Sequence, residues 1–150
     1  TRSHGGSWYA VHCCAVGGAV TTARIITAQA LRNSVEVRAL VGNRIHAASS
    51  VNKQSKRPLV AIRAHTDFPA QRRIGTRGYI QVWVHDDPGD YEVIDQVLAA
   101  CRTAIEAVPH SGDFLEARWI ETGVDLRDDV MESITRYMRF QFTFSRREAS

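Results

Sequence analysis

The side chains with the greatest chemical reactivity in this sequence gather near its N-terminus. His4, His12, Cys13 and Cys14 form the one cluster of histidines and cysteines along the chain. A structural zinc site needs four ligands that converge on the ion, and adjacent cysteines rarely do so. We therefore expect no metal site and no cofactor.

Two pairs of adjacent carboxylates, Asp86-Asp87 and Asp128-Asp129, could suggest acid–base catalysis. Adjacent side chains point apart on a strand or helix, so neither pair forms a catalytic dyad by itself. We expect the first pair at a turn before a helix, and the second in a solvated loop or an electrostatic docking site. The sequence contains no glycine-rich phosphate loop, nucleophile-elbow serine or HExxH motif. We therefore expect that the protein is not an enzyme.

The composition is that of a soluble globular domain. Hydrophobic residues make up 44% and charged residues 23% of the 150 residues. No apolar run approaches the roughly 20 residues of a membrane span, so we expect no membrane partner. The three cysteines include an adjacent pair, which is not a disulfide framework and favours a reducing compartment.

Charge is distributed unevenly along the chain. Residues 1–85 hold 12 Lys/Arg and 2 Asp/Glu, whereas residues 86–150 hold 7 and 14, which together give the net charge of +3. A folded protein with faces of opposite sign could associate head to tail. The alternative is that the charges of the two halves intermix on the folded surface.

The hydrophobic pattern predicts an N-terminal arm, residues 1–19, followed by one domain, residues 20–150. The arm has four glycines, no acidic residue and no regular period. Amphipathic stripes and alternating runs define the elements of the domain. These are a helix from Ala23 to the Gly42-Asn43 stop, strands at Ile45–Ala48, Leu59–His65 and Gly78–His85, a helix from Tyr91 to Pro109, and strands at Leu115–Thr122 and Arg136–Ser145.

This order, α-β-β-β-α-β-β, predicts a two-layer α+β domain. We expect a mostly antiparallel sheet of 4–5 strands with both helices on one face. The stripe of the second helix includes Cys101, which is therefore predicted to be a core residue and not a nucleophile. The apolar stripe of the first predicted helix includes Val35, which we therefore expect to face the core.

The second face of the predicted sheet is unusual, because aromatic, arginine and glutamine side chains alternate onto it. Such residues are enriched in protein interfaces, where they bury a large area and keep a polar handle. We interpret this face as a partner surface; the alternative is that loops or the arm cover it as ordinary core. Its residues are Tyr79, Gln81, Trp83, Tyr137, Arg139 and Gln141.

Two basic loops, Ser49–Pro58 and Thr66–Arg77, and one acidic loop, Gly123–Glu132, carry further candidate contacts. The basic residues could meet phosphates or an acidic protein surface, and the sequence does not decide between these. The candidate docking residues are Lys53, Lys56, Arg57, Arg72, Arg73, Arg77, Asp125, Asp128 and Asp129.

Four segments carry a resemblance to a known family: RALVGNRIHA, RPLVAIRAHT, GYIQVWVHDDPGDYEVIDQVLAACRTAI and TRYMRFQFTFS. With the helix before them, they resemble the tail terminator, or tail completion, proteins of long-tailed siphophages. The resemblance covers Thr21 to Arg146, and its most specific part is the strand, acidic turn and helix around Trp83 and Tyr91. The arm, residues 1–19, falls outside it.

The resemblance implies a structural virion protein of the phage tail and neck, assembled in the host cytoplasm. Such proteins form a homo-oligomeric ring, commonly a hexamer, that caps the head-proximal end of the tail tube, stops its polymerisation and offers a docking surface. The implied partners are other copies of the chain, the major tail tube protein, the head–tail connector protein, and DNA that passes without sequence recognition. The alternatives are another neck component, such as a connector or head-closure protein, and a small nucleic-acid-binding α+β module. On the tail terminator hypothesis, Tyr79, Trp83, Tyr137, Arg139 and Gln141 contact the ring or its lumen.

Overall fold

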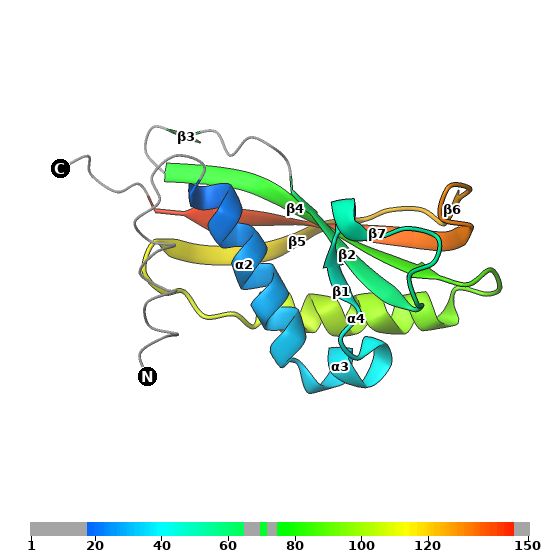
Figure 1. Ribbon diagram of the computed structural model, residues 1–150. Helices are drawn as coiled ribbons and strands as arrows, with labels where there is room; N and C mark the ends of the chain where they lie inside the picture. The colour runs from blue at the N-terminus through cyan, green and yellow to red at the C-terminus, as the bar shows by residue number, and fades with distance from the viewer. Residues whose placement is uncertain (1–17, 65–69, 72–74, 146–150) are drawn as a thin grey trace.

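A computed structural model describes residues 18–64, 70–71 and 75–145 (Figure 1). The predicted arm, and with it the histidine–cysteine cluster, lies outside these ranges except for its last two residues. The elements are α2 (Gly18–Asn33), α3 (Val35–Val41), β1 (Ile45–Ala47), the 3-10 turn η1 (Ala48–Ser50), β2 (Leu59–Ala64), β3 (Ala70–Gln71), β4 (Gly75–Asp86), α4 (Glu92–Glu106), β5 (Phe114–Thr122), β6 (Leu126–Asp128) and β7 (Ser133–Phe144).

The strands form one sheet in the order β1-β2-β4-β7-β5, with β3 added to β4 and β6 added to β7. Of the strand pairs in this part of the chain, β1 and β2 run parallel and all the others run antiparallel. The five strands of the main path confirm the predicted mostly antiparallel sheet. The short strands β3 and β6 were not predicted, because their sequences, AQ and LRD, lack the alternation of apolar and polar residues that marks β1.

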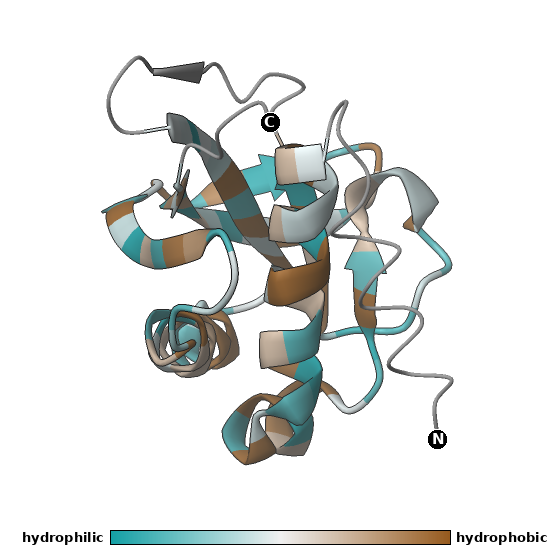
Figure 2. Ribbon diagram, turned by 90° about the vertical axis from the view of Figure 1, so that its left-hand side faces the viewer, coloured by the Kyte–Doolittle hydropathy of each residue, from teal (hydrophilic) through white to brown (hydrophobic). Residues whose placement is uncertain are grey.

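The three described helices lie on one face of the sheet, so the predicted two-layer α+β architecture is confirmed (Figure 2). Between the layers lies a continuous core, to which β4 and β7 contribute alternate residues. Its fully buried members include Leu31, Val37, Ile80, Val82, Val84, Ile94, Phe140 and Phe142.

The helix α4 follows the sequence prediction closely. Its buried residues are Ile94, Val97, Leu98, Cys101 and Ile105, which form the predicted stripe. Cys101 is a core residue, as predicted, and burial raises the pKa of its thiol to about 12. The thiol therefore stays protonated at neutral pH and behaves as a small apolar group.

The single first helix that the sequence predicts is two helices in the structure. The chain breaks at Ser34, whose backbone is extended and whose Oγ accepts a hydrogen bond from the Val37 amide at 3.2 Å. This N-cap starts α3 in a new direction, and Val35 is 74% exposed instead of lying on the buried stripe. The start was also misplaced, since α2 begins at Gly18 rather than Ala23. The predicted stop is confirmed, because Gly42 ends α3 with a φ of 61°.

Candidate partner surface

The candidate interface residues lie together on the sheet face that the helices leave open. In the antiparallel pairing of β4 with β7, Tyr79 is opposite Gln141, Gln81 opposite Arg139, and Trp83 opposite Tyr137. Residues that are directly opposite point to the same side of a sheet. We call this surface the far face. All six of these side chains are half-buried.

Contacts among these side chains hold the far face in a defined arrangement. The rings of Trp83 and Tyr137 are 4.7 Å apart between centroids, and the guanidinium of Arg139 lies 4.9 Å from the Tyr79 ring centroid. Glu121 accepts a hydrogen bond from the Tyr137 hydroxyl at 2.9 Å and forms an ion pair with Arg139 at 3.5 Å. The bond to Glu121 raises the pKa of Tyr137. The aromatic and cationic groups are therefore already ordered for contact with a partner.

Loops cover one end of the far face and leave the other end open. Leu59, Ala61 and Met131 form a second, smaller buried cluster on this side, and Trp83 packs against it. The turn between β6 and β7 supplies Met131, so the loops cover the Trp83 end. At the other end Tyr79 and Gln141 remain partly open to solvent. The assignment of the far face to partners stays a prediction.

The sequence prediction missed several charged residues of the far face, among them Arg63, Glu116, Arg118 and Glu121. Arg63 is opposite Gln81 in the β2–β4 pairing, and Arg118 is opposite Gln141 in the β5–β7 pairing. Glu121 comes opposite Arg139 only because β5 is irregular between Trp119 and Glu121. Alternation along a regular strand could have identified the two arginines, but the sequence gives no signal for the irregularity.

Gly123 fits closely against the ring of Tyr137, which leads to a first prediction. A Cβ added at this position would lie 2.6 Å from Cδ1 and 2.9 Å from Cζ of the ring. We expect Gly123→Ala to displace the ring from Trp83 and to lower the free energy of unfolding by about 1–3 kcal/mol, the usual cost of overpacking. Urea unfolding and near-ultraviolet circular dichroism measure the two effects.

The control for this prediction is Gly89→Ala, whose added Cβ would meet only the Asp87 carbonyl oxygen at 3.9 Å. This variant should have the same free energy of unfolding and the same near-ultraviolet circular dichroism spectrum as the wild-type protein. An unchanged near-ultraviolet spectrum in Gly123→Ala would contradict the described packing of Tyr137.

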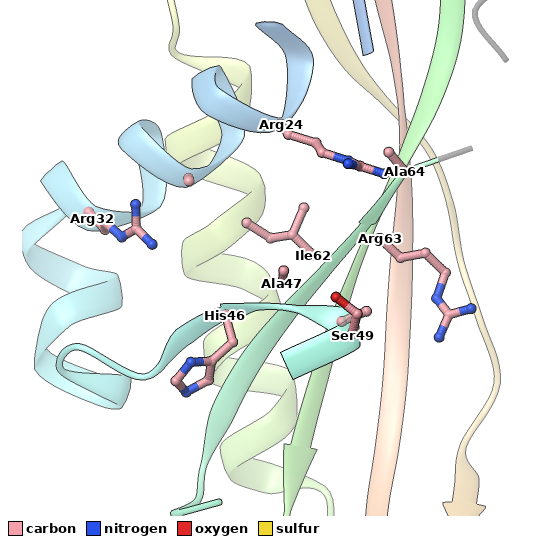
Figure 3. A pocket seen from close by; sticks show the side chains of 10 residues that line it. Arg24, Arg32, His46, Ala47, Ser49, Ile62, Arg63 and Ala64 are labelled. Atoms are coloured by element: carbon pink, nitrogen blue, oxygen red, sulfur yellow. The ribbon is translucent and has the colours of Figure 1, made fainter. Parts of the chain in front are cut away.

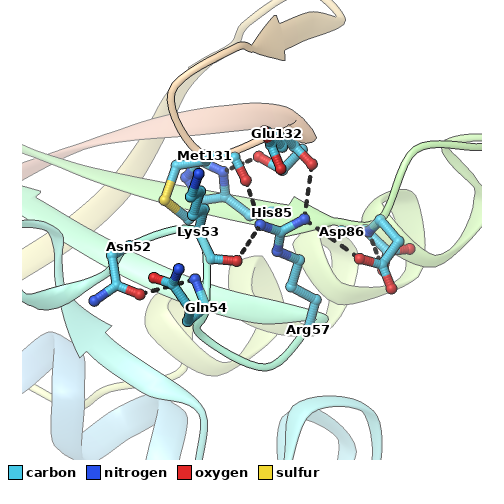
Figure 4. A network of polar contacts seen from close by, with 10 residues as sticks. Asn52, Lys53, Gln54, Arg57, His85, Asp86, Met131 and Glu132 are labelled. Atoms are coloured by element: carbon cyan, nitrogen blue, oxygen red, sulfur yellow. Dashed lines mark hydrogen bonds and ion pairs between the residues drawn. The ribbon is translucent and has the colours of Figure 1, made fainter.

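Arg57, a predicted docking residue, is committed to contacts within the chain (Figure 4). Its guanidinium donates to the carbonyl oxygens of Lys53 at 3.1 Å, of Glu132 at 2.8 Å, and of Met131. It also forms an ion pair with Asp87 at 3.3 Å, and only 7% of its side chain is exposed. Arg57 therefore joins three loops at one end of the sheet.

The other predicted docking residues lie in different settings. Lys53 and Lys56 are exposed on the loop before β2, whereas Arg77 belongs to β4 and not to the predicted connection. Arg72 and Arg73 lie outside the described residues. On the acidic side, Asp125 pairs with Arg136, Asp128 accepts from the Met131 amide, and Asp129 pairs with Arg127 at 3.7 Å.

His85 lies at the covered end of the far face and is 6% exposed. Its Nδ1 and the Ser133 Oγ share a hydrogen bond of 2.9 Å. Burial lowers the pKa of His85, and nearby Arg57 lowers it further, against an opposing effect of Asp128. The folded protein therefore holds this imidazole neutral at pH values where an exposed histidine is partly protonated.

The lowered pKa predicts that the free energy of unfolding decreases in mild acid. Below about pH 6.5 the unfolded chain takes up a proton at His85 that the folded chain resists, so acid favours unfolding. The contribution of neutral His85 to the free energy of unfolding is fully present above that pH. It is lost as the pH falls toward the folded-state pKa of His85. Urea unfolding of wild type and His85→Gln at about pH 7.5 and about pH 5.5 tests this. An equal acid-induced loss in both proteins would contradict it.

Within the described ranges, no three or more His, Cys, Asp or Glu side chains come together in a way that could hold a metal ion. No helix of the same ranges is long and apolar enough to cross a membrane. The far face thus offers aromatic and arginine groups for contact, with no assembled set of metal ligands in this part of the chain.

Comparisons with known proteins find similarity to a solved structure. No protein-family model matches the sequence, and no curated protein matches it either. Among solved structures, a chain in the structure described as "Virion of native gene transfer agent (GTA) particle" superposes with a TM-score of 0.61. The match covers 79% of this chain and 91% of that chain at 16% sequence identity. The two chains share one fold.

Proposed function

We propose that the protein is a structural component of a phage-like virion and has no enzymatic activity. The observation that carries this proposal is the fold shared with a chain of a gene transfer agent particle, over 91% of that chain. A virion component must bind other polypeptides over a large part of its surface. The far face supplies the aromatic and arginine residues that such contacts use.

The finer proposal is that the chain is a tail terminator of the virion tail and neck. In this function, copies of the chain form a closed ring, commonly a hexamer, on the head-proximal end of the tail tube. The ring stops polymerisation of the major tail tube protein and presents a surface to the head–tail connector protein. DNA passes through the ring without sequence recognition. The resemblance of the four sequence segments supports this assignment over other virion roles.

The deciding experiment is electron microscopy of particles assembled without this protein. A tail terminator should leave tails that are overlong and not joined to heads, because nothing stops the tube from growing. Tails of normal length that fail to join heads would instead assign the chain to a connector or head-closure role. Intact, infectious particles of normal tail length would contradict both assignments.

A nucleic-acid-binding module is the second candidate, and one observation favours it. The pairing of the strands places Arg63, Arg77, Arg118 and Arg139 on the same far face. A DNA-binding surface releases about one counterion per phosphate that it neutralises, so its affinity falls steeply with salt. Binding of the purified protein to duplex DNA with a slope of several phosphates would favour this candidate.

A further inference from the structure

The connection between β5 and β7, residues 123–132, projects at one end of the molecule (Figure 1). We call it the tip. Three large apolar side chains of the tip are exposed: Val124 at 71%, Leu126 at 39% and Val130 at 84%. The described residues contain only two other exposed large apolar side chains, so these three form the main exposed apolar group of this part of the chain. Exposed apolar side chains concentrated on one projection indicate a contact with another polypeptide.

A hollow of about 400 Å³ lies between α2 and the edge of the sheet (Figure 3). Alanines and Ile62 give it an apolar lining, and Arg24 and Arg32 extend toward it from α2. Arg63 also borders it, with its side chain directed away from α2. No Asp or Glu lines this hollow. The hollow therefore suits an apolar side chain that is accompanied by a carboxylate.

The ion pairs of the molecule leave the hollow and the tip with opposite charge. Among the described residues, only the Arg57–Asp87 pair joins the basic first half of the chain to the acidic second half. Arg24 and Arg32 have no carboxylate partner in these ranges. The tip has four acidic residues and one arginine, Arg127, which pairs with Asp129 at 3.7 Å while 92% of the Asp129 side chain stays exposed. The charge difference between the two halves of the sequence is therefore also present in the folded protein, between the basic hollow and the acidic tip.

We infer that the hollow between α2 and β1 receives the tip of a second copy of this chain. Val130 enters the apolar lining, and Asp129 beside it meets Arg24 and Arg32 at the rim. This inference rests on the proposed function, because it names the surfaces through which copies associate. The contact is head to tail, since each copy uses its hollow toward one neighbour and its tip toward the other.

Two variants with complementary defects test the inference. The hollow variant is Arg24→Glu/Arg32→Glu, and the tip variant is Asp129→Lys/Val130→Ser. All four side chains are exposed, so neither variant should unfold, which circular dichroism checks. Sedimentation velocity of the full chain should show about a 100-fold rise in the dissociation constant for each variant alone. Their mixture should form 1:1 dimers that do not grow, because only one intact hollow and one intact tip can meet.

The matched controls are Arg38→Glu and Glu36→Lys, which change an exposed arginine and an exposed glutamate of α3; neither residue lines the hollow or belongs to the tip. Both should associate as the wild-type protein does. Wild-type association by both test variants would overturn the inference while leaving the virion function intact. A defect in the hollow variant alone, or a mixture that forms no dimer, would also overturn it. Failure of the virion function appears separately, as normal particles assembled without the protein.

Discussion

Arg57→Met is expected to lower the free energy of unfolding by about 2–4 kcal/mol, because three carbonyl oxygens and one carboxylate lose their donor together. The carbonyls belong to Lys53, Met131 and Glu132, and the carboxylate belongs to Asp87. Methionine keeps the length of the side chain, so the loss reports the hydrogen bonds rather than the packing of the stem. Urea unfolding followed by far-ultraviolet circular dichroism measures the change.

Lys56→Met is the matched control, since the neighbouring Lys56 is exposed and has no contact of this kind. It should change the free energy of unfolding by less than about 0.5 kcal/mol. Arg57→Lys should fall between the two, because one ammonium cannot reach all the acceptors that a planar guanidinium joins. If Arg57→Met and Lys56→Met change the free energy of unfolding by the same amount, the three loops are held together by other contacts.

The double variant Tyr79→Ala/Arg139→Ala is expected to weaken association with partners at least about 30-fold, because buried tyrosine and arginine contacts carry much of an interface energy. The stability should change far less. Arg139 is on the far face with 31% of its side chain exposed, and its ion pair with Glu121 is partly solvated. Sedimentation equilibrium gives the association constant, and urea unfolding gives the stability.

Gln96→Ala on the solvent side of α4 is the control for surface truncation, since Gln96 is exposed and lies on the opposite layer. It should leave the association constant unchanged. An unchanged association constant in the far-face variant would remove Tyr79 and Arg139 from the interface. A large loss of stability together with lost association would show that these residues support the fold instead.

The elements that the sequence predicted well are those in which local pattern and burial agree. The stripe of α4 and the alternation in β4 and β7 each place apolar groups at the period of one element. Because β4 and β7 pair in register, the polar positions of both strands meet on the far face. The composition of the candidate partner surface was therefore predictable, although its use by a partner was not.

Other features depend on contacts between distant parts of the chain, which sequence pattern does not encode. The bonds of Arg57 reach residues 74 and 75 positions away, and nothing near Arg57 distinguishes it from Lys53 or Lys56. The small cluster of Leu59, Ala61 and Met131 likewise joins β2 to the turn before β7, which is distant from β2 in the sequence. A shorter-range error was avoidable, because Ser34 is a strong N-cap residue and could have marked the break between α2 and α3.

Electron microscopy of the purified full-length protein tests the assembly account most directly. Closed rings with a central channel, in which the far face with Tyr79 and Arg139 contacts other polypeptides or the lumen, are the predicted result. Isolated single molecules at every concentration, with that face turned only to water, would contradict the account.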